Sequence, residues 1–465
     1  MTTTVVSGGT VVTAAERFVA DLYIRDGVIV GLGHDLDITV DTVIDATGCL
    51  LLPGGVDPHV HLDFPSLSTT TADTSHSGTA AAAQGGTTTI INFAMQQFGE
   101  ALPAALERSV AKADGQAVVD YGFHVVARDL GGDRVRGIDE LVESGASSIK
   151  LFMAYPGELM VDDATLLIAM ERMAAAGGLT MVHAENGSAI DVLVQRALRA
   201  GRTSPQWHGK TRPTILEAEA VHRATVLAEL VEAPTYFVHI SCEEALAEVA
   251  AAKAKGLPIH AETCPHYLTL DDSVYDGDAF DVAKYVMTPP LREAHHQGRL
   301  WHGIRRGDVD VVSTDHCPFC MLGQKDAGRD NFLEIPNGVG GVEYRLLLLF
   351  DRGVQAGRIS LEQLVAITAT NPAKLFGLYP RKGSLMVGAD ADLVILDPDG
   401  ETRLSVSSSP SKVDYSIYEG WTVAGAIRRV LSRGTVVAAD GVVQDLRGHG
   451  RFVARGPTLS KQHGS

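Results

Sequence analysis

The sequence predicts an α/β protein, a (β/α)8 barrel combined with a second, smaller β-sandwich domain. Between residues 54 and 378, short apolar stretches alternate with longer Ala-rich stretches, the pattern of βαβ units around a parallel sheet. Both chain ends instead carry strand–turn–strand patterns centred on Asp-Gly pairs. We therefore expect a barrel at 54–378 and a sandwich domain built from residues 1–53 and 379–465.

Eight strands are predicted for the barrel, at Gly55–His61, Thr87–Phe93, Tyr121–Val126, Ser148–Met153, Leu179–His183, Thr235–His239, Pro258–Thr263 and Val309–Asp315. Helices are expected between several of these strands, at Ala101–Ala113, Asp162–Ala176, Glu217–Leu230 and Glu243–Lys255. The terminal domain is predicted from hairpins at Ala20–Val30 and Thr435–Val443 and a strand at Ala391–Leu396. The polar segment Gly456–Ser465 is expected to form a loose tail or an arm onto another subunit.

Composition narrows the possible partners and the compartment. Lys and Arg number 39 against 57 Asp and Glu, giving a formal net charge of −18, and no basic stretch could follow a phosphate backbone, so we expect no nucleic-acid partner. The chain start has no signal-peptide pattern, and apolar runs such as Leu346–Phe350 are far too short to span a bilayer. The 5 cysteines favour a reducing compartment. We expect a cytoplasmic protein without membrane contact.

Metal-ligand residues end several predicted strands. His59 and His61 form an H-x-H, and because side chains alternate along a strand, both imidazoles point to the same face. Four further residues end later strands: Lys150, His183, His239 and Asp315. A lone strand-end histidine is more often a hydrogen-bonded structural residue. Six such residues at matching positions predict one metal site at the C-terminal rim of the barrel, where barrels place their chemistry.

Lys150 is the unusual member of this set, because an ammonium group would add a positive charge beside metal ions. A neutral lysine can react with carbon dioxide to give a carbamate, whose two oxygens can bridge two ions. With two divalent metals, neutral imidazoles, Asp315 and a hydroxide, the carbamate leaves a net charge of about +1, whereas an ammonium leaves about +3. Electrostatics therefore favour a carboxylated Lys150.

Nine motifs together carry a resemblance to a known family. They are Pro53–Asp63, Gly85–Ile91, Lys150–Gly157, Met181–Gly187, Val238–Leu246, Ala261–Leu268, Ser313–Phe319, Ile335–Gly338 and Asn371–Gly377. Through nearly its whole length the chain resembles the amidohydrolase superfamily, which has a TIM-type barrel, and within it the dihydropyrimidinase or D-hydantoinase branch.

The resemblance implies a site and a reaction. His59, His61, Lys150 and Asp315 would bind one zinc ion, and Lys150, His183 and His239 a second, with N6-carboxylated Lys150 and a hydroxide as bridges. Asp315 would carry the proton, Tyr155 would stabilise the oxyanion, and backbone groups at Thr288 and Asn337 would hold the substrate. The implied enzyme is a hydantoinase or dihydropyrimidinase, a homotetramer or homodimer. It would hydrolyse the cyclic amide of dihydropyrimidines or 5-substituted hydantoins to N-carbamoyl amino acids.

Some features differ from this branch, and other functions compete. The Phe64–Thr74 loop departs from the usual sequence and is expected to line the pocket for the ring substituent. Cys317 and Cys320 form a C-x-x-C without the second pair that a zinc ribbon needs, and the resemblance leaves Cys320 unexplained. Asp63 stands where dihydroorotases commonly carry an arginine for an acidic ring. An allantoinase-like hydrolase and a non-enzymatic scaffold protein remain alternatives, although scaffold proteins of this kind have lost metal ligands.

Overall fold

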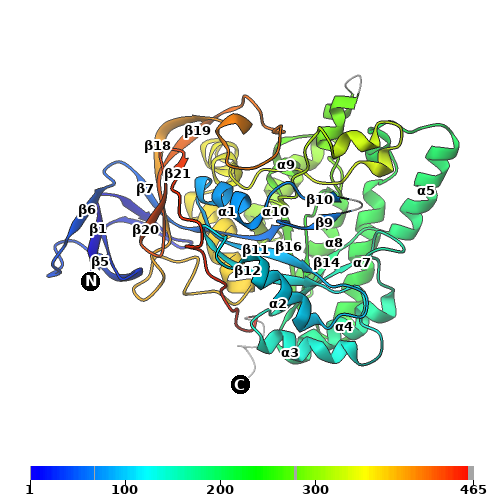
Figure 1. Cartoon of the computed structure of the whole chain (residues 1–465), viewed down its shortest axis with the longest axis horizontal. Coiled ribbons are helices and arrows are strands. Elements are labelled where there is room, and N and C mark those ends of the chain that lie inside the picture. The colour runs from blue at the N-terminus through cyan, green and yellow to red at the C-terminus, as the bar shows by residue number, and fades with distance from the viewer. Residues whose placement is uncertain (1, 67–68, 277–279, 459–465) are drawn as a thin grey trace.

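The computed structural model describes residues 2–66, 69–276 and 280–458. Its centre is an eight-stranded parallel sheet in which each strand pairs with the next strand along the chain. The first and last strands also approach each other, because an isolated parallel bridge joins Val60 to His316. The sheet is therefore curled (Figure 1). Its strands are β8 (Gly55–Val60), β11 (Thr87–Met95), β12 (Asp120–Val126), β13 (Ser148–Phe152), β14 (Leu179–His183), β15 (Thr235–Phe237), β16 (Ile259–Thr263) and β17 (Val311–Val312).

All eight predicted strands are present, but four of them end earlier than predicted: β8 and β13 by one residue, β15 by two and β17 by three. β15 stops at Phe237 and β17 stops at Val312, so His239 and Asp315 lie in the loops that follow these strands. Both residues have left-handed backbone conformations, with φ of 41° and 47°, which cannot continue a strand. Such conformations are uncommon outside glycine and cluster at functional sites.

Helices connect the strands in sequence. They are α1 (Ser75–Gln84), α2 (Leu102–Ala113), α3 (Gly137–Glu143), α4 (Asp163–Ala176), α5 (Gly187–Arg199), α6 (Trp207–Lys210), α7 (Thr214–Leu230), α8 (Glu243–Ala254), α9 (Pro265–Thr269) and α10 (His295–Arg306), with α11 (Arg345–Leu349), α12 (Leu361–Val365) and α13 (Asn371–Leu375) after β17. The four predicted helices are confirmed as α2, α4, α7 and α8. In α4, residues at the two ends explain why the helix could be predicted from local sequence. Asp162 caps the first turn, its carboxylate accepting from the Thr165 amide at 2.8 Å, and Gly177 ends the helix in a left-handed conformation.

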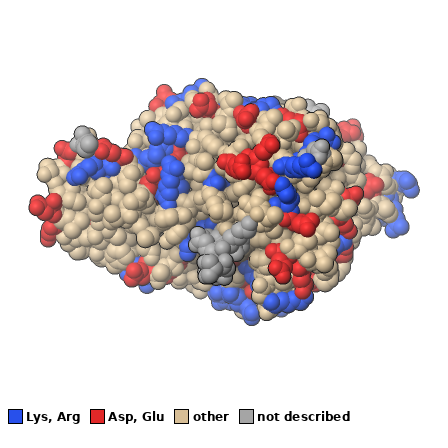
Figure 2. All heavy atoms as spheres, turned by 90° about the horizontal axis from the view of Figure 1, so that it is seen from below, with Lys and Arg blue, Asp and Glu red and all other residues tan. Residues whose placement is uncertain are grey.

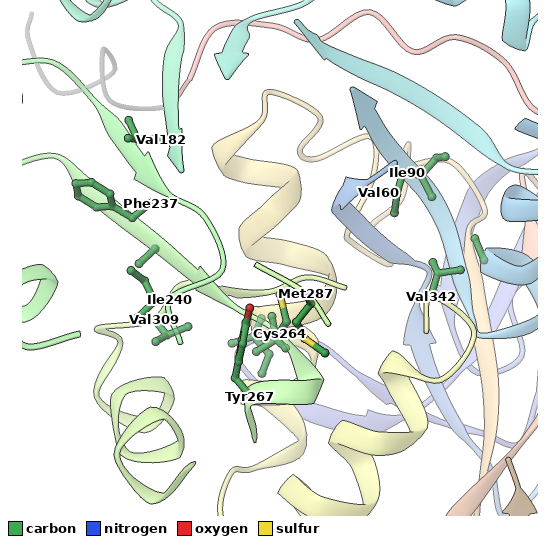
Figure 3. Packing of buried hydrophobic residues seen from close by; sticks show 14 of the residues in the cluster. Val60, Ile90, Val182, Phe237, Ile240, Cys264, Tyr267, Met287, Val309 and Val342 are labelled. Atoms are coloured by element: carbon green, nitrogen blue, oxygen red, sulfur yellow. The ribbon is translucent and has the colours of Figure 1, made fainter. Parts of the chain in front are cut away.

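The two faces of the curled sheet have separate apolar cores. Ile90, Val182 and Phe237 belong to the larger cluster (Figure 3), which also contains helix residues such as Leu246, whereas their chain neighbours Ile91 and Met181 belong to a second cluster. This alternation is what a strand buried on both faces requires. Because Val60 and Val182 belong to the larger cluster, the histidines next to them in sequence, at 59, 61 and 183, project to the inner side.

Two further sheets adjoin the curled sheet on one side (Figure 1). A four-stranded sheet contains only N-terminal strands: β1 (Thr3–Ser7), β4 (Asp21–Arg25), β5 (Val28–Gly33) and β6 (Thr42–Asp45). A seven-stranded sheet combines β2 (Thr10–Val12), β3 (Arg17–Val19) and β7 (Leu50–Pro53) with β18 (Leu393–Arg403), β19 (Thr422–Ser432), β20 (Thr435–Ala439) and β21 (Val442–Val443). Both predicted hairpins are confirmed, as β4–β5 and β20–β21.

The expectation that both chain ends contribute to one sheet is correct only for the seven-stranded sheet. There β7 and β18 pair antiparallel, with Leu52 opposite Val394. The other sheet has only N-terminal strands, although an isolated antiparallel bridge joins Val28 of β5 to Asp390. A third apolar cluster contains residues of both sheets, among them Leu22 and Leu393, so a shared core joins the two sheets.

The segment after β21 returns to the elements around the eight-stranded sheet. The backbone amides of Gly456 and Thr458 donate to the carbonyls of Gly377 and Gly177, both at 3.0 Å. The rest of the predicted tail, 459–465, lies outside the described residues. Acidic and basic side chains are interspersed over the face shown in Figure 2. Within the described ranges, no helix is long and apolar enough to cross a membrane.

Candidate metal centre and substrate cavity

A cavity of about 580 Å³ opens at the C-terminal ends of the curled sheet's strands and is lined by every residue that was predicted from the sequence for the site. The lining includes the six predicted metal ligands, His59, His61, Lys150, His183, His239 and Asp315, and the three predicted substrate-binding residues, Tyr155, Thr288 and Asn337. These residues come from segments up to 278 positions apart, from 59 to 337, and the curled sheet brings them together.

His59, His61 and Asp315 form the first half of the cluster. The Nε2 atoms of both histidines lie 3.1 Å from the same carboxylate oxygen, Oδ1 of Asp315. Their potential ligand atoms all lie within 4.8 Å of one another, as a shared cation would require. Burial alone would raise the pKa of Asp315, but the two histidines hold it well below its ordinary value. The carboxylate is therefore ionised and available to a metal.

His183 and His239 form the second half. Nδ1 of His183 lies 2.9 Å from Nε2 of His239, and the His239 ring centroid lies 5.5 Å from that of His59. Burial lowers the pKa of both imidazoles, that of His239 well below its ordinary value. Both rings are therefore neutral at neutral pH, which is the protonation state that a metal ligand needs.

Lys150 lies on β13 between the two apolar faces and is 1% exposed. Its Nζ atom lies 5.6 Å from the Phe93 ring centroid and 5.1 Å from that of Phe152. Burial lowers the pKa of this lysine to about 7, although the negative charges of Glu262 and Asp315 oppose the shift. A substantial fraction of the side chain is therefore a neutral amine at neutral pH.

Two buried carboxylates orient His59 and His183 from the side away from the cavity. Neither carboxylate was predicted from the sequence. Glu262 contacts Nδ1 of His59 and accepts a 2.7 Å hydrogen bond from the Tyr236 hydroxyl. Glu185 lies 2.8 Å from Nε2 of His183. Such contacts leave the other ring nitrogen free to face a metal, and they fix the imidazole orientation. The available signal for Glu262 was a glutamate within a predicted inner strand, 258–263, where an unpaired charge is costly.

The Glu262 contact gives a first testable prediction. Glu262→Gln removes the charge behind His59, and we expect metal affinity to fall about 10- to 100-fold, the usual effect of losing such a partner. Glu248→Gln is a matched control, because Glu248 pairs with His222 at 2.8 Å on the surface. Competition with a chelator measures both affinities. Equal affinities in wild type and Glu262→Gln would contradict the orienting role.

Tyr155 adjoins both the metal-ligand cluster and the other predicted substrate-binding residues. Nδ2 of Asn337 donates to its hydroxyl at 3.5 Å, and the Tyr155 ring centroid lies 5.7 Å from that of His183. Burial raises the pKa of Tyr155 to about 12, so the hydroxyl keeps its proton at neutral pH. Thr288 contacts Nε2 of His208 at 3.1 Å through its hydroxyl. His208 also lines the cavity and was not singled out from the sequence.

The Phe64–Thr74 loop borders the cavity, as expected from its position after His61. Phe64, Pro65 and Ser66 are lining residues, and strands β9 (Pro65–Ser66) and β10 (Thr69–Thr70) pair antiparallel. Residues 67–68 lie outside the described part of the chain. The loop is therefore placed to contact a bound molecule, together with Met95, Phe152 and Leu159.

Asp63 is oriented differently from what the comparison with dihydroorotases assumed. Its backbone φ is 54°, and its carboxylate accepts from the Ser75 amide at 2.8 Å and pairs with Lys112 at 3.1 Å. Asp63 is not among the residues that line the main cavity. Its charge therefore gives no direct argument about the substrate, because the carboxylate contacts the start of α1 instead.

Cys317 and Cys320 are both free thiols, and they differ in environment. Cys317 lines the cavity, whereas Sγ of Cys320 lies 3.4 Å from the Lys412 carbonyl. Neither belongs to a group of potential metal ligands among the described residues. His316 likewise contacts Asp73 at 2.9 Å and is a structural residue behind the cavity.

Fold and site together define an α/β protein with a histidine–carboxylate–lysine cluster at the C-terminal ends of a curled parallel sheet. Residues 50–437 match the amidohydrolase family. The chain is 47% identical to a D-hydantoinase of Streptomyces coelicolor, over 97% of this chain and 98% of the relative. A dihydropyrimidinase structure from Brevibacillus agri superposes with a TM-score of 0.97 at 44% identity, covering 98% of this chain and 99% of that chain. The L-hydantoinase of Arthrobacter aurescens superposes with a TM-score of 0.90 at 32% identity, covering 98% and 100%.

The chain belongs to the amidohydrolase family, in the branch of the hydantoinases and dihydropyrimidinases.

Proposed function

We propose that this enzyme hydrolyses the cyclic amide bond of dihydropyrimidines or 5-substituted hydantoins and releases N-carbamoyl amino acids. One observation carries the proposal: six candidate metal ligands, a protonated tyrosine and two candidate substrate-binding residues line a single cavity. The relatives named as hydantoinases and dihydropyrimidinase support this substrate class over allantoin. A non-enzymatic scaffold does not need such a cluster, and here all six positions are filled.

The donor set fits two zinc ions. His59, His61 and Asp315 would hold one ion and His183 and His239 the other, with a carboxylated Lys150 between them. Three features support this assignment: imidazole and carboxylate donors are those that zinc prefers, the second ring nitrogens of two histidines contact carboxylates, and Lys150 is buried with a pKa of about 7. When bound, paired divalent ions acidify a water molecule and polarise the amide carbonyl.

The protein side chains divide the remaining work. Asp315, which bonds to two imidazoles, would accept the proton of the attacking water and deliver it to the departing amide nitrogen. The Tyr155 hydroxyl, protonated because its pKa is about 12, would donate to the oxygen on which negative charge develops. Backbone groups at Thr288 and Asn337 would hold the ring amide. Because these segments are fixed before substrate arrives, little orientation entropy is lost on binding.

The same family assignment supports a fuller architecture. We infer a (β/α)8 barrel of the TIM type at 54–378 and a β-sandwich domain from 1–53 and 379–465. The parallel bridge between Val60 and His316 supports closure of the barrel, and the apolar cluster shared by the two smaller sheets supports the sandwich. We also propose a closed homo-oligomer, a tetramer or a dimer, in the cytoplasm.

The test combines metal content with a comparison of substrates. Protein refolded with zinc and bicarbonate should hold about two zinc ions per chain. It should open dihydrouracil, hydantoin or one enantiomer of a 5-aryl hydantoin, which is measured as N-carbamoyl amino acid released. Because both D- and L-hydantoinases share this fold, the two enantiomers are assayed separately. Stoichiometric zinc without turnover of any of these compounds would refute the proposed reaction.

A further inference from the structure

Two consecutive residues, Gln324 and Lys325, contact the segments that form different sides of the cavity. Gln324 ends the connection that follows Cys320, and Lys325 begins the 3-10 turn η4 (Lys325–Gly328). Neither is among the residues that line the cavity. Both residues are hydrogen-bonded to the backbone of Cys320. The Cys320 amide donates to Oε1 of Gln324 at 2.7 Å, and the Lys325 amide donates to the Cys320 carbonyl at 3.0 Å.

Lys325 joins the two backbone segments of the predicted amide-binding side. Its Nζ atom donates to the carbonyls of Val286 at 2.9 Å and Pro336 at 3.0 Å. Val286 lies two residues before Thr288, and Pro336 directly precedes Asn337. The two segments also meet directly, because the amide of the residue after Asn337 donates to the Val286 carbonyl at 3.0 Å. The lysine therefore bridges both segments just outside the cavity.

The burial of Lys325 makes a purely stabilising role a poor explanation. The side chain is 0% exposed, and none of the carboxylates in the described ranges lies within 4.0 Å of its nitrogen. Desolvating an amino group is costly, and an apolar side chain of similar length would avoid that cost. The amino group instead fixes the relative position of two backbone segments, because its two hydrogen bonds hold the Val286 and Pro336 carbonyls around one nitrogen.

Gln324 makes the corresponding contacts on the other side of the cavity. Its Nε2 atom donates to Oγ1 of Thr69 at 2.8 Å and to the Thr70 carbonyl at 2.7 Å. Thr69 and Thr70 form β10, which pairs with the cavity-lining strand β9. With Oε1 held by the Cys320 amide, both ends of this amide group are engaged. The side chain is therefore a rigid link to the Phe64–Thr74 loop.

We propose that Gln324 and Lys325 act as a positioning pair, in which Lys325 holds the backbone segments that bind the ring amide and Gln324 holds the loop that borders the ring substituent. The inference rests on the proposed function, because it assumes that a cyclic amide occupies the cavity. Both residues act through others and contact no reacting atom. The pair is itself held by the backbone of Cys320, whose amide and carbonyl bond to Gln324 and Lys325.

The first experiment replaces Lys325 by methionine, which has similar length and no donor. We expect KM for dihydrouracil and hydantoins to rise about tenfold or more, because the buried carbonyls of Val286 and Pro336 lose the donor that joins their segments, while zinc content stays at the wild-type level. Lys253→Met is the matched control: Lys253 donates to the Gly307 carbonyl at 2.9 Å and pairs with Asp310, away from the cavity lining. Its KM should match wild type.

The second experiment replaces Gln324 by methionine. Because its contacts lead to the loop at the substituent side, kcat/KM for a 5-aryl hydantoin should fall about tenfold more than kcat/KM for dihydrouracil, which has no ring substituent. Lys325→Met should lower both values by similar factors. Equal losses for the two substrates in Gln324→Met would overturn the division of roles.

Hydrogen exchange of backbone amides measures how firmly these segments are held, and it does not depend on turnover. Exchange in 284–291 and 335–340 should accelerate in Lys325→Met, and exchange in 69–73 should accelerate in Gln324→Met. Faster exchange with unchanged KM would refute the positioning role, as would unchanged exchange.

If wild-type protein with two zinc ions opens none of the compounds, the proposed function fails, and the exchange rates alone then decide whether the pair holds these segments. Lys325→Gln, which keeps a shorter donor, replaces Lys325→Met if that variant does not fold.

Discussion

Replacing Lys150 with alanine is expected to abolish turnover. The side chain stands between the two halves of the cluster, with a buried amine whose pKa is about 7, and its carboxylated form would be the only bridge that the chain supplies between two metal ions. Without it two bound ions would lose a shared anion, and repulsion between them would favour release of one or both. We expect zinc to fall from about two ions per chain to one or none and kcat/KM to fall roughly 10³-fold or more.

Bicarbonate dependence separates this explanation from a simple loss of structure. Wild-type protein refolded with zinc should recover more activity with bicarbonate than without it, because the carbamate forms from carbon dioxide and the neutral amine. Lys150→Ala should be insensitive to bicarbonate while keeping a wild-type far-UV circular dichroism spectrum. A folded Lys150→Ala protein that holds two zinc ions and turns over normally would exclude the bridging role.

The second large effect is expected from Tyr155→Phe, which deletes one hydroxyl at the cavity. Because burial keeps the pKa near 12, wild-type Tyr155 offers a proton throughout the neutral range and would donate it to the developing oxyanion. Removing one such donor lowers kcat by about 10²- to 10³-fold in comparable sites. Zinc content should not change, since the hydroxyl contacts Asn337 and no metal-ligand atom among the described contacts.

Tyr418→Phe provides the matched control for this measurement. Tyr418 is buried, 2% exposed, and does not line the cavity, so the loss of its hydroxyl should leave kcat at the wild-type value. Steady-state rates at saturating substrate, together with zinc analysis, complete the comparison. A Tyr155→Phe enzyme with the wild-type kcat would remove this residue from the reaction.

Much of the fold and of the candidate site could be predicted from local sequence patterns. The strands of the eight-stranded sheet could be recognised as apolar runs, because strands buried on both faces need apolar residues at successive positions. The H-x-H was readable because alternation places residues two apart on one side, and His59 and His61 indeed face the same Asp315 oxygen. Lys150 could be recognised because a lysine within an apolar strand is costly to bury unless its amino group has a partner.

Features that depend on contacts between distant segments were not predictable in this way. Glu262 meets His59 across 203 positions of sequence, and Gln324 meets Thr69 across 255. Asp63 follows the H-x-H closely, yet its left-handed backbone turns the carboxylate toward α1 and away from the cavity. No spacing rule encodes such directions, because they follow from how whole loops pack.

The sequence by itself determined the alternation of strands and helices, the family, and the identity of the residues at the strand ends, since these depend on side-chain chemistry and short-range periodicity. Only the tertiary structure decided the surroundings of those residues: which carboxylate lies behind which imidazole, and how Gln324 and Lys325 hold the cavity walls. The physical reason is that burial and hydrogen-bond direction, which set pKa and orientation, arise only when the sheet curls and brings distant loops to one end.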